Sequence, residues 1–285
     1  MRVAAVSAHF GRDVGQCLAK IEGIVADARA RGVQLLVFPD ATIGGYLGDL
    51  AGADGTGLPP ALDAAGPELA RVAAAAGEMV VCVGYRELAD GRHHNSAVCL
   101  TGDGVLGTHR KVHQPAGERA AYAPGDRFAA FDTPLGPMGL LVDYDKTFPE
   151  AARALAAAGA PLLACLSAWP ASLTNRAPRL VQDRQSRLFD LYDCARAAEN
   201  QVVWVSANQT GTMGRLRFLG QSKVVGPGGD VLARTWAKAG LAVADVDVAA
   251  EVGRARLVLD HLRERRPDAY RPTHLPDPHP TGGPR

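Results

Sequence analysis

The chain has 285 residues, of which 47% are hydrophobic and 21% charged, and its formal net charge is +1. This length allows one sizeable core or two small ones. The near-neutral charge, without a basic stripe carrying interleaved aromatic residues, does not support a nucleic acid or an anionic membrane as a partner.

The first residues, MRVAAVSAHF, lack the charged, apolar and cleavage regions of a secretory signal. The longest uncharged stretch, residues 154–171, is interrupted by Gly159 and Pro161 and is too rich in alanine to predict a membrane span. The five cysteines are scattered without CxxC spacing, as in reduced cytosolic proteins. We therefore predict a cytoplasmic protein with no membrane partner.

Along the chain, an alanine-rich helical stretch leads four times through a Gly or Asn, suited to a left-handed helix end, into an apolar strand. The units join residues 26–31 to 34–39 through Gly32, 69–76 to 78–85 through Gly77, 151–158 to 161–170 through Gly159, and 188–199 to 201–209 through Asn200. Helices that alternate with fully apolar strands predict sheets covered on their faces.

Two further segments resemble β-hairpins, so we expect mixed rather than parallel sheets. Residues 96–111 carry a Gly-Asp-Gly turn, and residues 222–235 carry the turn Gly226–Asp230. Because no linker divides the chain, we predict a single domain over residues 1–262. Residues 263–285 are rich in proline without periodicity, which predicts an extended arm or a tail.

Four segments carry the candidate chemistry. LLVFPD (35–40) is a strand that ends in an acid, and HRKVHQPAGERAAYAPGD (109–126) holds Lys111 and Glu118. In GLLVDYDKTFPE (139–150) an apolar run stops at Asp143, and ARAAENQVVWVSANQTG (195–211) is followed closely by GQSKVVGPGGDVLA (220–233). In this order and spacing, over roughly residues 2–247, they resemble the nitrilase (carbon–nitrogen hydrolase) superfamily.

The resemblance implies a four-layer α-β-β-α sandwich of two mixed sheets. It also implies self-association as a homodimer or larger, and a small-molecule substrate handled without a metal or other cofactor. Members of the superfamily use a Glu–Lys–Cys set, in which cysteine attacks an amide or nitrile carbon, glutamate activates water and lysine stabilises the oxyanion.

Carried over by position, the lysine is Lys111 and a second glutamate is Glu118. The first glutamate falls on Asp40, and the cysteine falls on Asp143. The resemblance also places Trp169 in a substrate-pocket loop, and Tyr46 and Tyr144 are candidates for the same pocket.

Purely structural roles for these residues remain open. Asp143 could cap the following helix, Asp40 could be a turn residue, Lys111 could be a surface lysine and Trp169 a core residue. Asp143 could also be an introduced substitution, which would leave Asp40 unexplained. His109 and His113 are four residues apart, but the flanking sequence favours a strand entering a loop over a zinc-binding helix.

An aspartate at 143 does not suit covalent catalysis. A carboxylate, with an ordinary pKa of about 3.9, is expelled from a tetrahedral intermediate far more easily than an amine is. Three carboxylates around Lys111 would leave two net negative charges in a sheltered pocket. We therefore expect one carboxyl to hold a proton, or the pocket to receive a cation such as an aminated substrate, rather than a metal.

Two functions follow from these expectations. The first is an enzyme acting on a C–N bond of a small amide, carbamoyl or amine metabolite, in which Asp40, Lys111, Glu118 and Asp143 perform acid–base chemistry. The second is a catalytically inactive relative that binds a ligand or regulates a partner.

Overall fold

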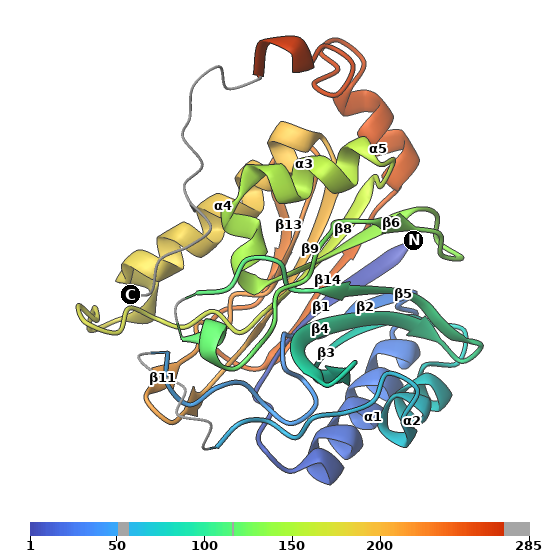
Figure 1. The fold of residues 1–285 in the computed structure, drawn as a ribbon. Coiled ribbons are helices and arrows are strands. Elements are labelled where there is room, and N and C mark those ends of the chain that lie inside the picture. Colours follow the sequence, from blue (N-terminus) through green and yellow to red (C-terminus); the bar gives the residue numbers. More distant parts are fainter. Residues whose placement is uncertain (51–56, 116, 271–285) are drawn as a thin grey trace.

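The computed structural model describes residues 1–50, 57–115 and 117–270, and its strands form two stacked layers (Figure 1). The first layer has the strand order β5-β4-β3-β2-β1-β14, and the second has the order β6-β7-β8-β9-β12-β13. The layers join where Ser7 and Ala8 pair with Asn208 and Gln209. The strands of the first layer are β1 (Arg2–Ala8), β2 (Leu35–Val37), β3 (Val80–Ala89), β4 (Arg92–Thr101), β5 (Gly104–Arg110) and β14 (Gly240–Asp245). Those of the second are β6 (Ala130–Phe131), β7 (Met138–Val142), β8 (Leu162–Ser167), β9 (Val203–Gln209), β12 (Lys223–Val225) and β13 (Val231–Arg234).

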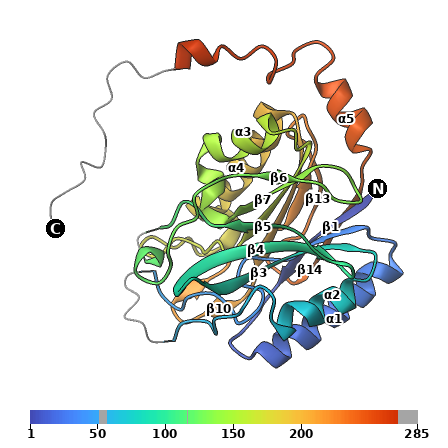
Figure 2. The ribbon, with the colours of Figure 1, turned by 45° about the vertical axis from the view of Figure 1, so that its right-hand side comes forward.

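Helices cover the outer face of each layer, as Figures 1 and 2 show. Helices α1 (Val14–Ala30) and α2 (Pro67–Ala76) lie on the first layer. Helices α3 (Pro149–Ala157) and α4 (Arg184–Asn200) lie on the second. This arrangement confirms the predicted α-β-β-α sandwich with mixed sheets.

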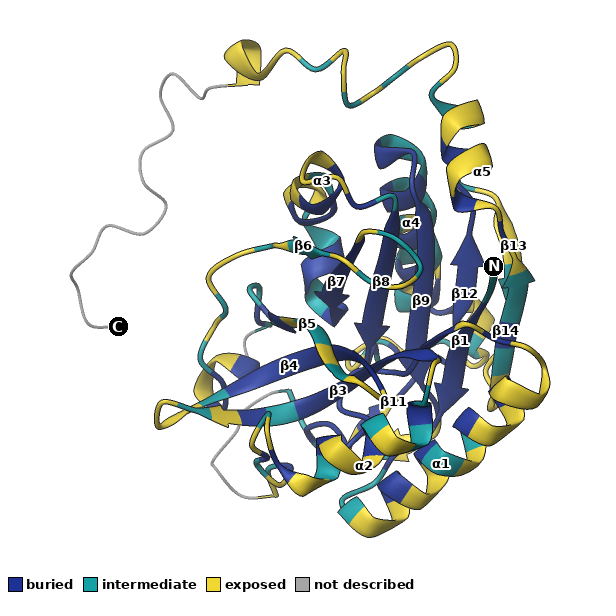
Figure 3. Ribbon diagram, turned by 90° about the vertical axis from the view of Figure 1, so that its right-hand side faces the viewer, coloured by how far each residue is buried: buried dark blue, intermediate teal, exposed yellow. Residues whose placement is uncertain are grey.

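The two-residue period of the strands divides the core into three parts. In β1, Val3 and Ala5 face the space between the layers, whereas Ala4 and Val6 face α1 and α2. In β7, Leu140 faces inward while Leu141 packs beneath α3. Both faces of these strands are therefore buried, as the dark strands of Figure 3 show, and a fully apolar sequence is what such strands require.

The left-handed residues predicted to end the helices are confirmed at the three glycines, which have positive φ, and lie one position later than predicted after α4. Asp13 and Asp183 cap α1 and α4 by accepting from the backbone N–H groups of Gln16 and Gln185. The left-handed residue that ends α4 is Gln201, with φ of 53°, rather than Asn200. The Gln201 side chain donates to the carbonyls of Ala255 and Leu259, so tertiary contacts hold this conformation.

Both predicted hairpins are present, as β4–β5 and β12–β13. The sequence interpretation did not identify the long antiparallel pairing of β3 with β4, which turns at Asp90 and Gly91. A short hairpin of β10 (Thr212–Met213) and β11 (Leu216–Arg217) stands apart from the large sheets. Short 3₁₀ turns complete the fold: η1 (Glu118–Ala120), η2 (Asp143–Thr147), η3 (Leu180–Gln182) and η4 (Pro267–Tyr270).

Helix α5 (Val248–Ala255) packs its buried Val248 and Val252 between the layers, and the chain then runs along the outside of the molecule (Figure 1). Leu262 still packs against the cluster beneath α3 and α4. The predicted arm begins at residue 263, and residues 271–285 of it lie outside the described residues. The domain boundary therefore stays a prediction. Within the described part of the chain, no helix has the length and apolar character that a membrane crossing needs.

Candidate active site

Four ionisable side chains from distant parts of the sequence meet where strands β2, β5 and β7 end. Asp40 lies three residues beyond β2, Lys111 and Asp143 directly follow β5 and β7, and Glu118 begins η1. One carboxylate oxygen from each of the three acids lies within 4.8 Å of the other two. The structure thus brings together all four residues predicted from the sequence, here called the acidic cluster.

Lys111 is the centre of the acidic cluster. Its fully buried Nζ donates to Glu118 Oε1 at 2.8 Å and to Asp143 Oδ2 at 3.1 Å. Burial alone would lower the pKa of Lys111, but the negative charges of Glu118 and Asp143 outweigh burial and hold this pKa above its ordinary value. The ammonium is therefore charged, and it fixes the two carboxylates on either side of it.

Asp143 occupies the turn at which β7 ends. Its φ of 48° lies in the left-handed region, which is uncommon for a residue with a side chain. Asp143 Oδ1 accepts from the backbone N–H of Ala168 at 3.2 Å. It is also 5% exposed, whereas Asp40, Lys111 and Glu118 are fully buried. Asp143 is therefore the member of the cluster that faces an incoming molecule.

Asp40 lies deeper, in a tight turn after β2. A side chain at Gly84 would come within 2.6 Å of the Ala41 backbone nitrogen, so β3 approaches this turn only because residue 84 is glycine. Asp40 Oδ2 accepts from the Asn95 amide at 3.0 Å, whereas Oδ1 is buried with no partner among the described residues. The turn thus places an incompletely satisfied carboxyl beside the other members of the cluster.

The carboxyl of Asp40 favours a protonated form. Burial raises the pKa of Asp40 to about 8; Lys111 opposes this shift, while Asp143 and Glu118 add to it. Burial also raises the pKa of Glu118. At neutral pH a neutral Asp40 therefore stands near Asp143 and the charged Lys111, as expected from the charge balance of the sequence.

Two residues that position the cluster were missed by the sequence interpretation. Asn95, in β4 opposite Arg86, donates to Asp40 and accepts from the Lys111 backbone N–H at 2.8 Å. Gln209 donates to the Asp40 carbonyl at 2.9 Å. Both are polar residues within long strands, and only their burial distinguishes them from surface amides.

Asp145 is the third missed residue, and it ties the end of β5 to the turn after β7. Its buried carboxylate accepts from His109 Nε2 at 2.8 Å, His113 Nδ1 at 3.0 Å, and the backbone N–H groups of Val112, His113 and Val142. Burial alone would raise its pKa, but these donors hold it at about 2. His109 and His113, which have zinc-like spacing in the sequence, thus hydrogen-bond to one carboxylate.

A pocket of about 190 Å³, here called the inner pocket, opens above Asp143. The predicted residues Tyr46, Tyr144 and Trp169 all line it, and Tyr46 also donates to Glu118. The described residues that line it are Tyr46, Leu50, Pro115, Asp143, Tyr144, Trp169, Pro170, Ala171, Ser172, Leu173 and Gln185. Among these described residues, Asp143 is the one with a charged side chain, and the others are largely aromatic and apolar.

The three carboxylates of the acidic cluster are close enough to share a metal ion. The Lys111 ammonium, however, already hydrogen-bonds two of them. A divalent cation at this point would meet a buried positive charge at short range, so the donor set fits a lysine better than a metal.

A second buried ionic group, the lysine cluster, lies behind the inner pocket. Asp193 accepts from Lys146 at 2.9 Å, from Lys223 at 2.7 Å and from the Trp204 ring N–H at 3.0 Å. Lys146 also lies over the rings of Trp169 and Phe189. This cluster joins the turn after β7 to helix α4 and to the second layer.

None of the residues that line the inner pocket is a cysteine. Cys165 is buried within β8, and burial raises the pKa of its thiol to about 12. The side chain is therefore a core residue and not a replacement nucleophile.

Comparison with known proteins finds a matching family model and similar proteins described as a nitrilase and an amidase. Residues 2–255 match the family model described as carbon-nitrogen hydrolase. A "Probable nitrilase" of Schizosaccharomyces pombe is 34% identical over 62% of this chain and 62% of its own. An (R)-stereoselective amidase of Pseudomonas sp is 31% identical over 81% of this chain and 79% of its own.

A solved structure extends the likeness to the whole fold. It is a variant of the amidase from Nesterenkonia sp. AN1, with the acetamide moiety of fluoroacetamide added covalently at its active-site cysteine. It matches with a TM-score of 0.76 and 26% identity over 95% of both chains.

Proposed function

Since this chain belongs to the carbon–nitrogen hydrolase family, we propose that it hydrolyses a C–N bond of a small amide or carbamoyl compound by acid–base chemistry, without a covalent cysteine intermediate. The observation that carries the proposal is the pairing of Asp143, which lines the inner pocket and is ion-paired with Lys111, with a fully buried Asp40 whose pKa lies at about 8. Two carboxyls held in different protonation states are the requirement for combined base and acid catalysis.

In the first step Asp143 acts as the base. A water in the inner pocket gives a proton to Asp143 while its oxygen bonds to the carbonyl carbon of the substrate. Lys111 has three N–H donors, two of which bind Glu118 and Asp143, so the third is free to stabilise the developing oxyanion. Glu118 holds Lys111 in place.

In the second step Asp40 acts as the acid. The C–N bond breaks, and the leaving nitrogen takes the proton of Asp40, so that a carboxylic acid and an amine or ammonia result. Transfer of a proton from Asp143 to Asp40 restores the starting state; the two carboxylates have oxygens within 4.8 Å of each other. Every atom of the substrate and of the water is accounted for without a cofactor.

The walls of the inner pocket supply the substrate contacts in this proposal. Tyr46 and Tyr144 bound the space above Asp143, and Trp169 is held by hydrogen bonds to Asn208 and Gln185. We further propose that the protein works in the cytoplasm, which is consistent with its five unpaired cysteines, and that it associates as a homodimer or larger.

The mechanism is tested by following amine or ammonia release from a panel of small amides and carbamoyl compounds. The intact mass of the protein is measured after rapid quenching during turnover. We expect release by the wild type with no added mass, and loss of release in Asp143→Asn and Lys111→Ala. The matched control is Asp40→Glu with Asp143→Cys, in which a thioester is expected to add the mass of the acyl group.

An acyl adduct on the wild type would contradict the acid–base mechanism. A compound that binds tightly and is recovered unchanged after long incubation would instead favour the inactive, ligand-binding alternative.

A further inference from the structure

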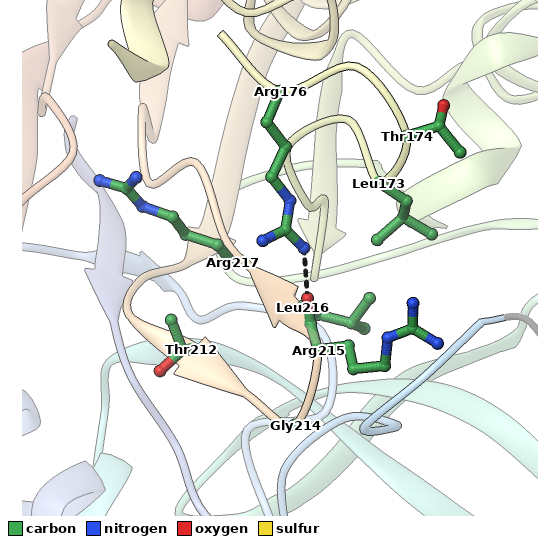
Figure 4. Close-up of a pocket in the computed structure, with 8 residues that line it drawn as sticks. All are labelled: Leu173, Thr174, Arg176, Thr212, Gly214, Arg215, Leu216 and Arg217. Atoms are coloured by element: carbon green, nitrogen blue, oxygen red, sulfur yellow. Dashed lines mark hydrogen bonds between the residues drawn. The ribbon is translucent and has the colours of Figure 1, made fainter. Parts of the chain in front are cut away.

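A second pocket, here called the outer pocket, carries a concentration of arginine. Its volume is about 460 Å³, and Arg176, Arg215 and Arg217 all line it, together with the hydroxyl side chains of Thr174 and Thr212. Figure 4 shows Arg176 reaching from its loop to the β10–β11 hairpin, where it donates to the Arg215 carbonyl. None of the described residues that line this pocket is acidic.

The three guanidinium groups are only partly engaged. Arg176 uses Nε and Nη2 to hold the carbonyls of Ser172 and Arg215. Arg215 pairs with Asp49 at 3.2 Å, with 77% of its side chain exposed. Arg217 has no side-chain partner within the described ranges of the chain. The pocket therefore keeps donors and positive charge available for a ligand.

The hairpin that carries Arg215 and Arg217 has a fixed position. A side chain at Gly214, whose φ is 54°, would come within 2.4 Å of the Gly48 carbonyl oxygen, and the Arg215 N–H donates to that same oxygen. On the other side, Ala171 donates to the Arg217 carbonyl at 2.8 Å. The arginines are therefore set against the segment that forms the wall of the inner pocket.

The two pockets are continuous along this wall, because Leu173 lines both of them. Their charges are opposite among the described lining residues: the inner pocket is lined by Asp143, whereas the outer pocket is lined by three arginines, of which Arg215 pairs with Asp49. A molecule that spans both would find a negative floor at one end and a positive surface at the other.

We propose that the outer pocket binds an oxyanion, a carboxylate or a phosphate, at the far end of the substrate whose C–N bond lies in the inner pocket. The proposal rests on the proposed function and adds the substrate class: amides that carry an acidic tail. Arginine suits this task because its planar donors match the oxygens of both anions. Repulsion from Asp143 and attraction to the arginines would orient such a substrate with its neutral amide inward.

The test uses monoamides of dicarboxylic acids of increasing chain length, the corresponding ω-phosphonoalkanamides, and the uncharged methyl esters of the monoamides. We expect the wild type to prefer one of the acidic series over the esters, and Arg215→Gln with Arg217→Gln to raise KM for that series about tenfold while kcat stays the same. The KM for the esters should not change. The charge-matched control, Arg92→Gln with Arg263→Gln, alters two exposed arginines outside the pocket and should behave as the wild type.

The carboxylate and phosphonate series distinguish the two anions. Equal effects of the outer-pocket variant on acids and esters, or a wild type that prefers the esters, would overturn the proposal. Binding of the same compounds to the wild type and to Asp143→Asn by calorimetry separates this outcome from a failure of the proposed function. If the acids bind in a way that depends on the arginines but are not turned over, the outer pocket stands as an anion-binding site and the catalytic role of the acidic cluster is rejected.

Discussion

The protein buries two ionic clusters near the same turn, and they differ in how far their charges are satisfied. In the lysine cluster, Lys146, Trp204 and Lys223 donate to both oxygens of Asp193. Burial alone would raise the pKa of Asp193, but the two lysines outweigh it and hold the pKa below its ordinary value. This carboxylate is fully ionised and fully paired.

The acidic cluster has the opposite character. Lys111 pairs with two of the three carboxyls, two carboxyl oxygens have no partner in the described parts of the chain, and the pKa of Asp40 lies at about 8. Complete pairing stabilises a fold, whereas an unpaired buried carboxyl costs stability and is retained where it has a task. The contrast explains why only one of the two clusters has a member that faces a pocket.

The largest difference between the two clusters should appear when the Asp143 side chain is neutralised. We expect Asp143→Asn to lower kcat by about 10²- to 10⁴-fold, the usual contribution of a general base. Its thermal midpoint should stay close to that of the wild type, because one negative charge leaves a cluster that has an excess of them. Asp132→Asn, which changes an exposed aspartate directly after β6, is the matched control and should change neither quantity.

Removal of Asp193 should give the reverse result. Asp193→Ala leaves Lys146 buried without its paired carboxylate and leaves Lys223 with only the partly exposed Asp190, and we expect a loss of about 3–5 kcal/mol in the free energy of unfolding. Chemical denaturation measures this loss. Asp190→Asn removes a half-exposed partner of Lys223 and should cost about 1 kcal/mol or less; equal losses in both variants would contradict the distinction between the clusters.

Asp145 is a paired carboxylate adjacent to the acidic cluster, so it should behave like Asp193. Its pKa of about 2 is depressed below the unfolded value, so its stabilisation is present above pH 4 and is lost as the pH falls from about 4 to about 2. The shift corresponds to about 2 kcal/mol. Asp145→Asn should be less stable at pH 7 and should lose less stability on acidification, as measured by denaturation at several pH values.

Asp40 should show a pH dependence of the opposite sign. Because its folded pKa is raised, the folded state binds more protons than the unfolded state between about pH 4 and pH 8, and this contribution to stability falls as the pH rises through that range. Asp40→Asn should therefore raise the thermal midpoint more at pH 8 than at pH 4. In the wild type, kcat/KM should fall about tenfold per pH unit above pH 8, as the proton donor ionises. An activity that rises through pH 9 would contradict the role of Asp40 as an acid.

The strands and helices were predictable because their signals are local. Apolar runs such as LLACLS (162–167) require burial on both faces, and a glycine such as Gly159 marks a helix end. The four members of the acidic cluster were predictable only through the family resemblance, since nothing local separates Glu118 from a surface glutamate. The family resemblance identifies the sequence positions of these four residues, and the structure gives the distances between their side chains.

The positioning residues could not be predicted for a physical reason. Asn95 and Asp145 act through partners 55 and 36 residues away in the chain, so their roles depend on tertiary packing. The arginines of the outer pocket belong to two segments, a loop and a short hairpin, which hydrogen bonds to the carbonyls of Arg215 and Arg217 bring together. Only the Asp-Tyr-Asp spacing at 143–145 hinted at a second acid near the turn.

The single charge on the floor of the inner pocket has a consequence for the end of each reaction cycle. Hydrolysis would turn a neutral amide into a carboxylate directly above Asp143, and two such charges 4 Å apart repel by about 4 kcal/mol in a partly screened site. The site would then release its acid product readily, so that accumulated product inhibits it weakly. An aspartate at this turn would thereby keep the enzyme working at product concentrations that would occupy an uncharged site.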